Sequence, residues 1–246
     1  MASFFHRRTL PAPQSENPYW MSFSDMMSGL LIIFILVCTT LLLKLSQMEE
    51  QVMENIEELK AASKVRSEIL QDIFQELKAH GIEVIISDND TILRIPETSF
   101  HFMTGRYDIT EELKPAAELI GRALCKAILR DSRWQYLETV FVEGHSDSRK
   151  APNYRMGNWE LSALRAISLW QFWINRTDYG EILQKLRNRE GKILFSVSGY
   201  AATRRVAEVE NSEEAMRRNR RIDIRFTTRQ PSIMEMEEVI SPLQGE

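Results

Sequence analysis

The most apolar part of the chain is a run near its N-terminus. Residues 26–43 read MMSGLLIIFILVCTTLLL and contain no charged side chain. About 20 such residues cross a bilayer as a helix. Counting from Tyr19 and Trp20, two aromatic residues suited to the headgroup region, makes the stretch long enough. The pattern therefore predicts one transmembrane helix over residues 19–45.

The charges on the two sides of this helix predict its orientation. The leading segment carries Arg7 and Arg8, whereas the far flank soon turns acidic at Glu49 and Glu50. The positive-inside rule then places residues 1–18 in the cytoplasm and everything after the helix outside. A cleaved signal peptide is the alternative, but the residues that follow the run, LLLKLSQMEE, offer no small-residue cleavage site. We therefore expect a retained single-pass anchor.

Residues 46–80 are polar overall and have the spacing of an amphipathic helical connector. Their apolar residues recur at steps of three and four, and no proline or glycine occurs from 46 to 79. Gly81 is suited to end the helix. Two interpretations stay open: the helix pairs with its copy in a second chain, or it packs on its own domain. The apolar positions are Met48, Val52, Ile56, Leu59, Ile69, Ile73 and Leu77.

From residue 81 onward, short β-rich runs alternate with helical periods. The alternation predicts an α+β domain over residues 81–230, with helices packed on a mixed sheet, followed by a tail over 231–246. The expected elements are a hairpin over 82–97 around Asp88–Asp90, a helix over 111–129 with Thr110 as its N-cap, a strand over 136–145, a helix over 158–174, a short helix within 177–191, a strand over 192–200 and a last strand ending at 226.

Composition narrows the function classes. The 246 residues allow one ordinary domain plus a sizeable extra segment. A net charge of −4 does not indicate nucleic-acid binding. Cys38 and Cys125 stand in different contexts and do not indicate a disulfide scaffold. The four histidines have no partner at metal-ligand spacing. The sequence therefore predicts no metal, no cofactor, no catalytic residue and no enzyme.

Asp25 is the one carboxylate between Trp20 and the apolar run. An ionised Asp well inside a bilayer costs roughly 2.5–3.5 kcal/mol on insertion scales, and such residues usually serve an ion path. Small residues lie on its helical face at i−3, i+3 and i+4, namely Ser22, Ser28 and Gly29. We expect Asp25 to be an ion-translocating group beside a partner helix. The alternative is a side chain that snorkels to the cytoplasmic interface.

Four separated motifs of the outer domain resemble those of one family. They are Gly144-His145-Ser146-Asp147, then Asn158 to Ser162 with Arg165-Ala166, then Gly199-Tyr200-Ala201, and then Asn219 to Asp223. In this order they resemble the OmpA-like peptidoglycan-binding domain, over roughly residues 82–228. The resemblance implies that Asp147 and Arg165 grip the diaminopimelate of the stem peptide, and that Asn158 and Leu161 line the same pocket. Two departures are the long loop before Asn158, with Gly157 in place of an aromatic residue, and the added segment 177–191.

The N-terminal segment PYWMSFSDMMSGLLIIFIL resembles that of MotB-like stator proteins, and is nearer to the ZorB family of Zorya anti-phage systems than to flagellar MotB. The resemblance implies that Asp25 carries the translocated ion, a proton. It also implies a dimer of this chain inside a ring of MotA-like (ZorA-type) subunits in the bacterial inner membrane, anchored to peptidoglycan. A flagellar or gliding stator is the alternative within this class, and a passive peptidoglycan tether is the alternative outside it.

Overall fold

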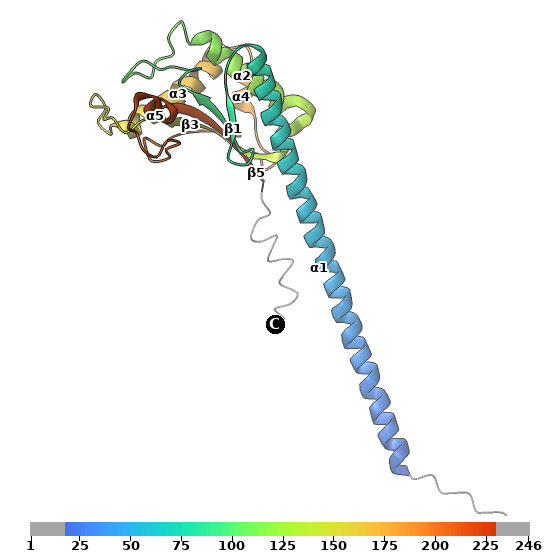
Figure 1. Cartoon of the computed structure of the whole chain (residues 1–246). Helices are drawn as coiled ribbons and strands as arrows, with labels where there is room; N and C mark the ends of the chain where they lie inside the picture. The colour runs from blue at the N-terminus through green and yellow to red at the C-terminus, as the bar shows by residue number, and fades with distance from the viewer. Residues whose placement is uncertain (1–17, 230–246) are drawn as a thin grey trace, which may run out of the picture. The chain divides into compact units, whose positions relative to one another are not determined.

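The computed structural model describes residues 18–229 (Figure 1). Within this range the chain divides into two compact units, one up to Glu54 and one from Asn55 onward. The first element is helix α1, Pro18–Ala79, which has 62 residues and runs through both units.

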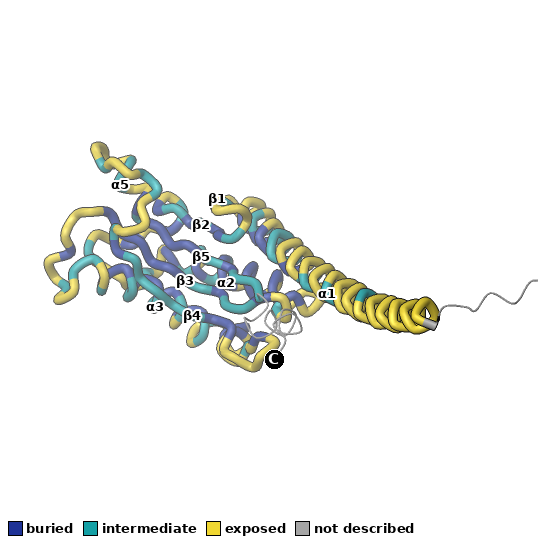
Figure 2. Tube along the Cα trace, turned by 90° about the horizontal axis from the view of Figure 1, so that it is seen from below, coloured by how far each residue is buried: buried dark blue, intermediate teal, exposed yellow. Residues whose placement is uncertain are grey.

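Helix α1 is long enough to cross a membrane, and its N-terminal part is apolar enough. Among the described residues, no other helix meets both conditions. Almost all residues of the N-terminal part are exposed, as the yellow of this part of the tube shows (Figure 2). Three hydroxyls in it donate to carbonyls one turn back, at 2.7–2.8 Å: Ser28 to Ser24, Thr39 to Ile35 and Thr40 to Val37. Such bonds satisfy hydroxyl groups inside the helix, as a lipid environment requires.

The second unit begins its sheet with the predicted hairpin. Strand β1, Ile85–Ser87, pairs antiparallel with β2, Ile92–Pro96. The three residues Asp88–Asp90 between them all have positive φ, from 52° to 56°. Asp and Asn tolerate this left-handed conformation better than other residues that carry a Cβ. The sequence around this turn therefore fixes both its place and its backbone shape.

The remaining elements complete a five-stranded mixed sheet. They are α2 (Lys114–Leu129), the 3₁₀ turn η1 (Arg130–Tyr136), β3 (Leu137–His145), α3 (Asn158–Arg176), α4 (Gly180–Lys185), β4 (Phe195–Gly199), α5 (Glu213–Asn219) and β5 (Arg221–Thr228). The strand order is β1-β2-β5-β3-β4, and only β3 and β4 run parallel, joined by α3 and α4. The predicted fold class, a long apolar helix followed by an α+β domain on a mixed sheet, is confirmed.

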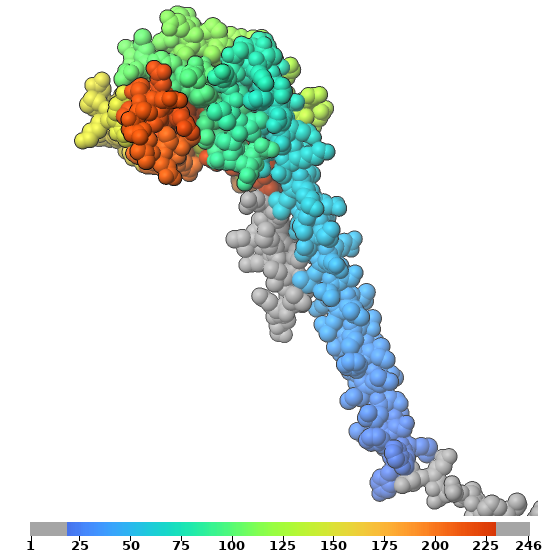
Figure 3. Space-filling view, in the orientation of Figure 1, coloured from blue at the N-terminus to red at the C-terminus, as the bar shows by residue number. Residues whose placement is uncertain are grey.

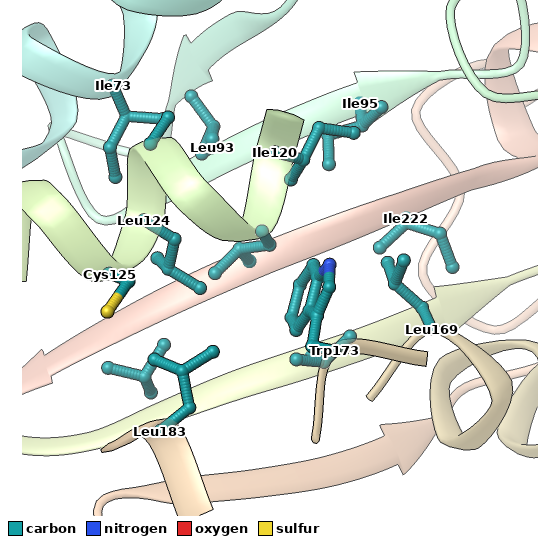
Figure 4. Close-up of a cluster of buried hydrophobic side chains, with 14 of the residues drawn as sticks. Ile73, Leu93, Ile95, Ile120, Leu124, Cys125, Leu169, Trp173, Leu183 and Ile222 are labelled. Atoms are coloured by element: carbon teal, nitrogen blue, oxygen red, sulfur yellow. The ribbon is translucent and has the colours of Figure 1, made fainter. Parts of the chain in front are cut away.

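The hydrophobic core lies between one face of the sheet and the helices that cover it. Alternate residues of the strands point into it, and helices α2 and α3 supply the facing side chains, as the close-up in Figure 4 shows. The indole Nε1 of Trp173 donates to the carbonyl of Ala117 at 2.7 Å, which ties α3 to α2. Buried core residues of the helices and strands include Leu93, Ile95, Ile120, Leu124, Val140, Val142, Leu169, Ile222, Ile224 and Phe226.

The last part of α1 belongs to this core as well. Ile69, Ile73 and Leu77 have no exposed surface and contact the core cluster. These residues lie in the stretch that the sequence assigns to the connector. Of the two interpretations of that stretch, packing on its own domain is therefore the one that holds for residues 69–77.

The predicted N-cap of the second helix is wrong. Helix α2 begins at Lys114, with Leu113 as its N-cap, and Pro115 lies in its first turn. The carbonyl of Thr110 accepts the N–H groups of Leu113 and Lys114, so Thr110 closes a preceding turn instead. Proline lacks an N–H and fits the first turn of a helix but not its interior. Because Pro115 stands there, the regular helix starts later than the Thr110 signal suggests.

Candidate functional site

Asp147 lies in a buried position two residues beyond the end of strand β3. The chain is held there by backbone bonds from Ser146 N to the carbonyl of Ala201 and from Tyr200 N to the carbonyl of Gly144, both 2.9 Å. The segment after β4 therefore supports the turn after β3. The residue Asp147 is 5% exposed.

The start of α3 fixes the loop that follows Asp147. Gly157, just before the helix, has φ +60° and ψ −133°, a conformation that glycine adopts readily and other residues rarely. Asn158 then donates from Nδ2 to the carbonyls of Asp147, at 3.0 Å, and Arg149, at 2.8 Å. The unusual backbone conformation thus explains why glycine stands at position 157, where the family often has an aromatic residue. Asn158 holds the two ends of the loop together.

Arg165 lies two turns further along α3 and is also 5% exposed. Its Nε donates to the carbonyl of Arg106 at 3.0 Å and its Nη2 to that of Met103 at 3.3 Å. Its guanidinium stands over the Phe102 ring, 5.1 Å from the centroid. Burial lowers the pKa of Arg165 to about 10, so it remains a cation at neutral pH. Among the described residues, no hydrogen bond is made by its Nη1.

The predicted site residues lie around one pocket. Asp147, Asn158, Leu161 and Arg165 all line a cavity of about 340 Å³. This volume is within the range of small-molecule sites, roughly 300–1,000 Å³. The structure therefore brings together the carboxylate, the guanidinium, the amide and the apolar side chain that the sequence singled out.

Two arginines at this pocket were missed at the sequence level. The Oδ2 atom of Asp147 accepts from Nε and Nη2 of Arg149, at 2.9 and 2.6 Å, and from Nη1 of Arg220, at 2.6 Å. Arg220 also holds both carboxylate oxygens of Glu97, at 2.6 and 2.5 Å. Arg220 belongs to one of the motifs, but its contact with Asp147 spans 73 positions, so no local pattern could reveal it.

The charges of this cluster reinforce one another. Burial alone would raise the pKa of Asp147, but hydrogen bonds from Arg149 and Arg220 outweigh it and hold that pKa below its usual value. Burial alone would lower the pKa of Arg220, but its bonds to Glu97 and Asp147 raise it instead. The site therefore presents an ionised carboxylate and ionised guanidinium groups at neutral pH.

A second buried charge cluster lies on the face of the sheet opposite the hydrophobic core. Ligand atoms of Glu143, His145 and Asp223 all lie within 4.8 Å of one another, a spacing that could hold a metal ion. Arginines already occupy both carboxylates: Arg225 holds Glu143 at 2.9 and 3.1 Å, and Arg94 holds Asp223 at 3.1 and 3.3 Å. Their positive charge opposes a further cation, and we interpret the cluster as an ion-pair network.

His145 in this network predicts a pH dependence of stability. Burial, followed by the charges of Arg221 and other arginines, lowers its pKa to about 2, against about 6.5 in an unfolded chain. Between about pH 2 and pH 6.5 the unfolded chain binds a proton at His145 that the folded chain does not bind. The neutral, buried His145 therefore leaves the folded state most stable above about pH 6.5, and this stability is lost as the pH falls. One proton corresponds to at most about 1.4 kcal/mol per pH unit.

We therefore expect His145→Gln to flatten the change in the free energy of unfolding between pH 7.5 and pH 5. Urea unfolding of the full chain in detergent, followed by circular dichroism at both pH values, measures it. His80→Gln is the matched control, because the His80 ring is exposed at the end of α1. If His145→Gln has the same pH dependence as the wild type, protonation of His145 does not limit stability.

The predicted membrane residues all lie on α1. Ser22, Asp25, Ser28 and Gly29 are exposed in the described chain and follow one face of the helix. Gly29 has no side chain, and small residues of this kind let a neighbouring helix approach closely in a membrane. The role of Asp25 as an ion site stays a prediction.

Comparisons with known proteins show what the second unit is similar to. Residues 101–220 match the OmpA family. No curated protein matches the sequence. Among solved structures, a putative MotB-like protein from Desulfovibrio vulgaris has a TM-score of 0.51 at 20% identity, over 71% of this chain and 96% of that one. The periplasmic domain of Helicobacter pylori MotB has a TM-score of 0.49 at 19% identity, over 67% of this chain and 94% of that one. The cell wall anchor of the Pseudomonas aeruginosa type VI secretion system has a TM-score of 0.46 at 24% identity, over 65% of this chain and 97% of that one.

Proposed function

We propose that the pocket of Asp147 and Arg165 binds the diaminopimelate of peptidoglycan, because it lies in the part of the chain, residues 101–220, that matches the OmpA family. The observation that carries the proposal is that Asp147 and Arg165, far apart in sequence and of opposite charge, line the same cavity. Diaminopimelate is a zwitterion, so its recognition requires one anion and one cation. In this proposal the domain is a binding module rather than an enzyme.

The hydrogen bonds of Arg165 support its role as the carboxylate-binding group. Two of its nitrogens are anchored on backbone carbonyls, so the guanidinium is held in place before a ligand arrives. A guanidinium in a fixed orientation binds a carboxylate better than a flexible ammonium does. Leu161 supplies an apolar wall for the methylene groups of the ligand.

The apolar part of α1 supports a single-pass anchor in the inner membrane. We propose that residues 1–18 lie in the cytoplasm and the OmpA-like domain in the periplasm, where peptidoglycan is found. Asp25 then lies near the cytoplasmic end of the membrane span. There it binds and releases an ion, a proton, along the small-residue face made by Ser22, Ser28 and Gly29.

The two sites together support a stator role. One elementary charge that crosses the membrane supplies about 2.3 kcal/mol per 100 mV. That energy can turn a ring of partner subunits only if this chain is held still, and wall binding by the domain would hold it. We propose a dimer of this chain inside a MotA-like (ZorA-type) ring, acting in anti-phage defence of the Zorya type. A flagellar or gliding stator and a passive wall tether are the other candidates.

The wall-binding part of the proposal is tested with purified sacculi. We expect the full chain in detergent to sediment with diaminopimelate-containing sacculi, and Arg165→Gln to lower the bound fraction about tenfold or more, because a charge-assisted pair is lost. Arg189→Gln is the control, since that arginine pairs with Glu58 on the surface, away from the pocket.

Arg165 is buried, so folding must be checked alongside binding. Arg165→Lys keeps the charge and loses the fork, and we expect it to bind more weakly than the wild type while it keeps a similar Tm. If both Arg165 variants fold and sediment like the wild type, the pocket is not the wall-binding site.

A further inference from the structure

The Asp147 carboxylate, which the proposed function assigns to the ligand ammonium, already accepts four N–H donors of the protein itself. Its Oδ1 accepts the backbone N–H of Arg149 at 3.1 Å. Its Oδ2 accepts three N–H donors, two from the Arg149 side chain and one from Arg220. An incoming ammonium can therefore bind Oδ2 of Asp147 only if one of the two guanidinium groups withdraws.

The two arginines differ in how firmly they are held. The Arg220 side chain is 12% exposed and pairs with three carboxylates, those of Glu97, Asp147 and Glu213. The Arg149 side chain is 49% exposed, and its one other ion-pair partner among the described residues is Glu213, at 3.1 Å. Arg149 is therefore the group that can leave at the lower cost.

The surroundings offer Arg149 a place to go. A second cavity of about 440 Å³ adjoins the first, and Arg149, Arg220 and Glu97 line both. Glu213, at the start of α5, lines the second cavity and already contacts Nη1 and Nη2 of Arg149. The second cavity is lined by residues of α5 and of the segment after β2. Figure 3 shows the orange surface of the α5 region beside green surface. Arg149 can thus release Asp147 and keep its ion pair with Glu213.

We propose that Arg149 is a displaceable occupant of the ammonium subsite. In the ligand-free protein it closes Asp147, and a ligand with a primary ammonium exchanges with it, leaving Arg149 on Glu213. This inference rests on the proposed function, because it names the state of the same pocket before binding. Each binding event then includes the breaking of the Arg149–Asp147 pair, which lowers the affinity.

Removal of the displaceable group should therefore tighten binding. Isothermal titration of the full chain in detergent with the tripeptide L-Ala–γ-D-Glu–meso-diaminopimelate measures it. We expect Arg149→Gln to bind about fivefold more tightly, the size expected for a half-exposed ion pair that the ligand no longer breaks. Arg155→Gln is the matched control, since it removes the same charge from an exposed position of the same loop. It should bind like the wild type.

A second ligand tests the mechanism. With the tripeptide acetylated on both of its amines, that of L-Ala and the side-chain amine of diaminopimelate, no ammonium competes for Asp147, so Arg149→Gln should show no gain. Weaker binding of the natural tripeptide by Arg149→Gln would mean that this guanidinium contacts the ligand, and equal binding would mean that it does not close the subsite; either result overturns the inference while leaving the proposed function in place. If neither the wild type nor the variant binds, the proposed function itself fails, and this inference with it.

Discussion

Replacement of Asp25 by Asn is expected to abolish ion-driven activity while the chain stays folded and inserted in the membrane. Asn has nearly the same size but cannot bind and release a proton, and a neutral amide costs less in lipid than a carboxylate. If the chain acts in the proposed anti-phage defence, phage plating on cells that carry it together with its partners should rise to the level seen on cells that lack it. The amount of chain in the membrane fraction should not change.

The matched variant keeps the titrating group. Asp25→Glu retains a carboxylate on the same helical face, and it should keep part of the activity. A passive wall tether needs no carboxylate in its membrane helix, so full activity of Asp25→Asn would support the tether and contradict the stator. If the chain serves motility instead, the same variant should stop swimming or gliding and leave phage plating unchanged.

Replacement of Gly144 by Ala is expected to destabilise the α+β domain severely. A Cβ at this position would lie 2.0 Å from the carbonyl oxygen of Ser162, far inside contact distance. Helix α3 cannot move away freely, because the Ser162 hydroxyl accepts the N–H of Ala201 at 3.0 Å, which ties the helix to the segment after β4. Strand β3 and helix α3 are thus in backbone contact where the pocket begins.

The cost of this clash should be at least about 4 kcal/mol, which lowers the Tm by about 10 °C or more in a domain of this size. Thermal unfolding of the full chain, followed by circular dichroism, measures it. Gly29→Ala is the control, since a Cβ there meets nothing within 4 Å. A Tm for Gly144→Ala within a few degrees of the wild type would show that α3 can shift, and that the pocket geometry is less rigid than described.

Local pattern explains which parts of the fold the sequence could predict. The hairpin at Asp88–Asp90 carries its own turn chemistry, and the strand and helix periods from 136 to 176 are set by neighbouring residues. Asp147 and Arg165 stand in recognisable motifs, and the structure brings both to one pocket. These features need no knowledge of distant contacts.

Long-range contact explains what the sequence could not predict. The hold of Arg220 on Asp147 and Glu97 depends on how β5 is placed against β3 and β2. The membership of Ile73 in the domain core likewise depends on tertiary packing, because helical spacing alone cannot say what a helix packs against. On α3, Arg165 occupies a buried position that a purely apolar face would give to a hydrophobic residue.

The most direct measurement compares two ligands that differ by one carboxylate. Isothermal titration of the full chain with L-Ala–γ-D-Glu–meso-diaminopimelate and with the same tripeptide that carries L-Lys separates the role of Arg165, because lysine lacks the carboxylate that this guanidinium would hold. The diaminopimelate peptide should bind about tenfold or more tightly, as expected for a charge-assisted pair. Equal affinity for the two peptides would contradict recognition of diaminopimelate by the pocket of Asp147 and Arg165.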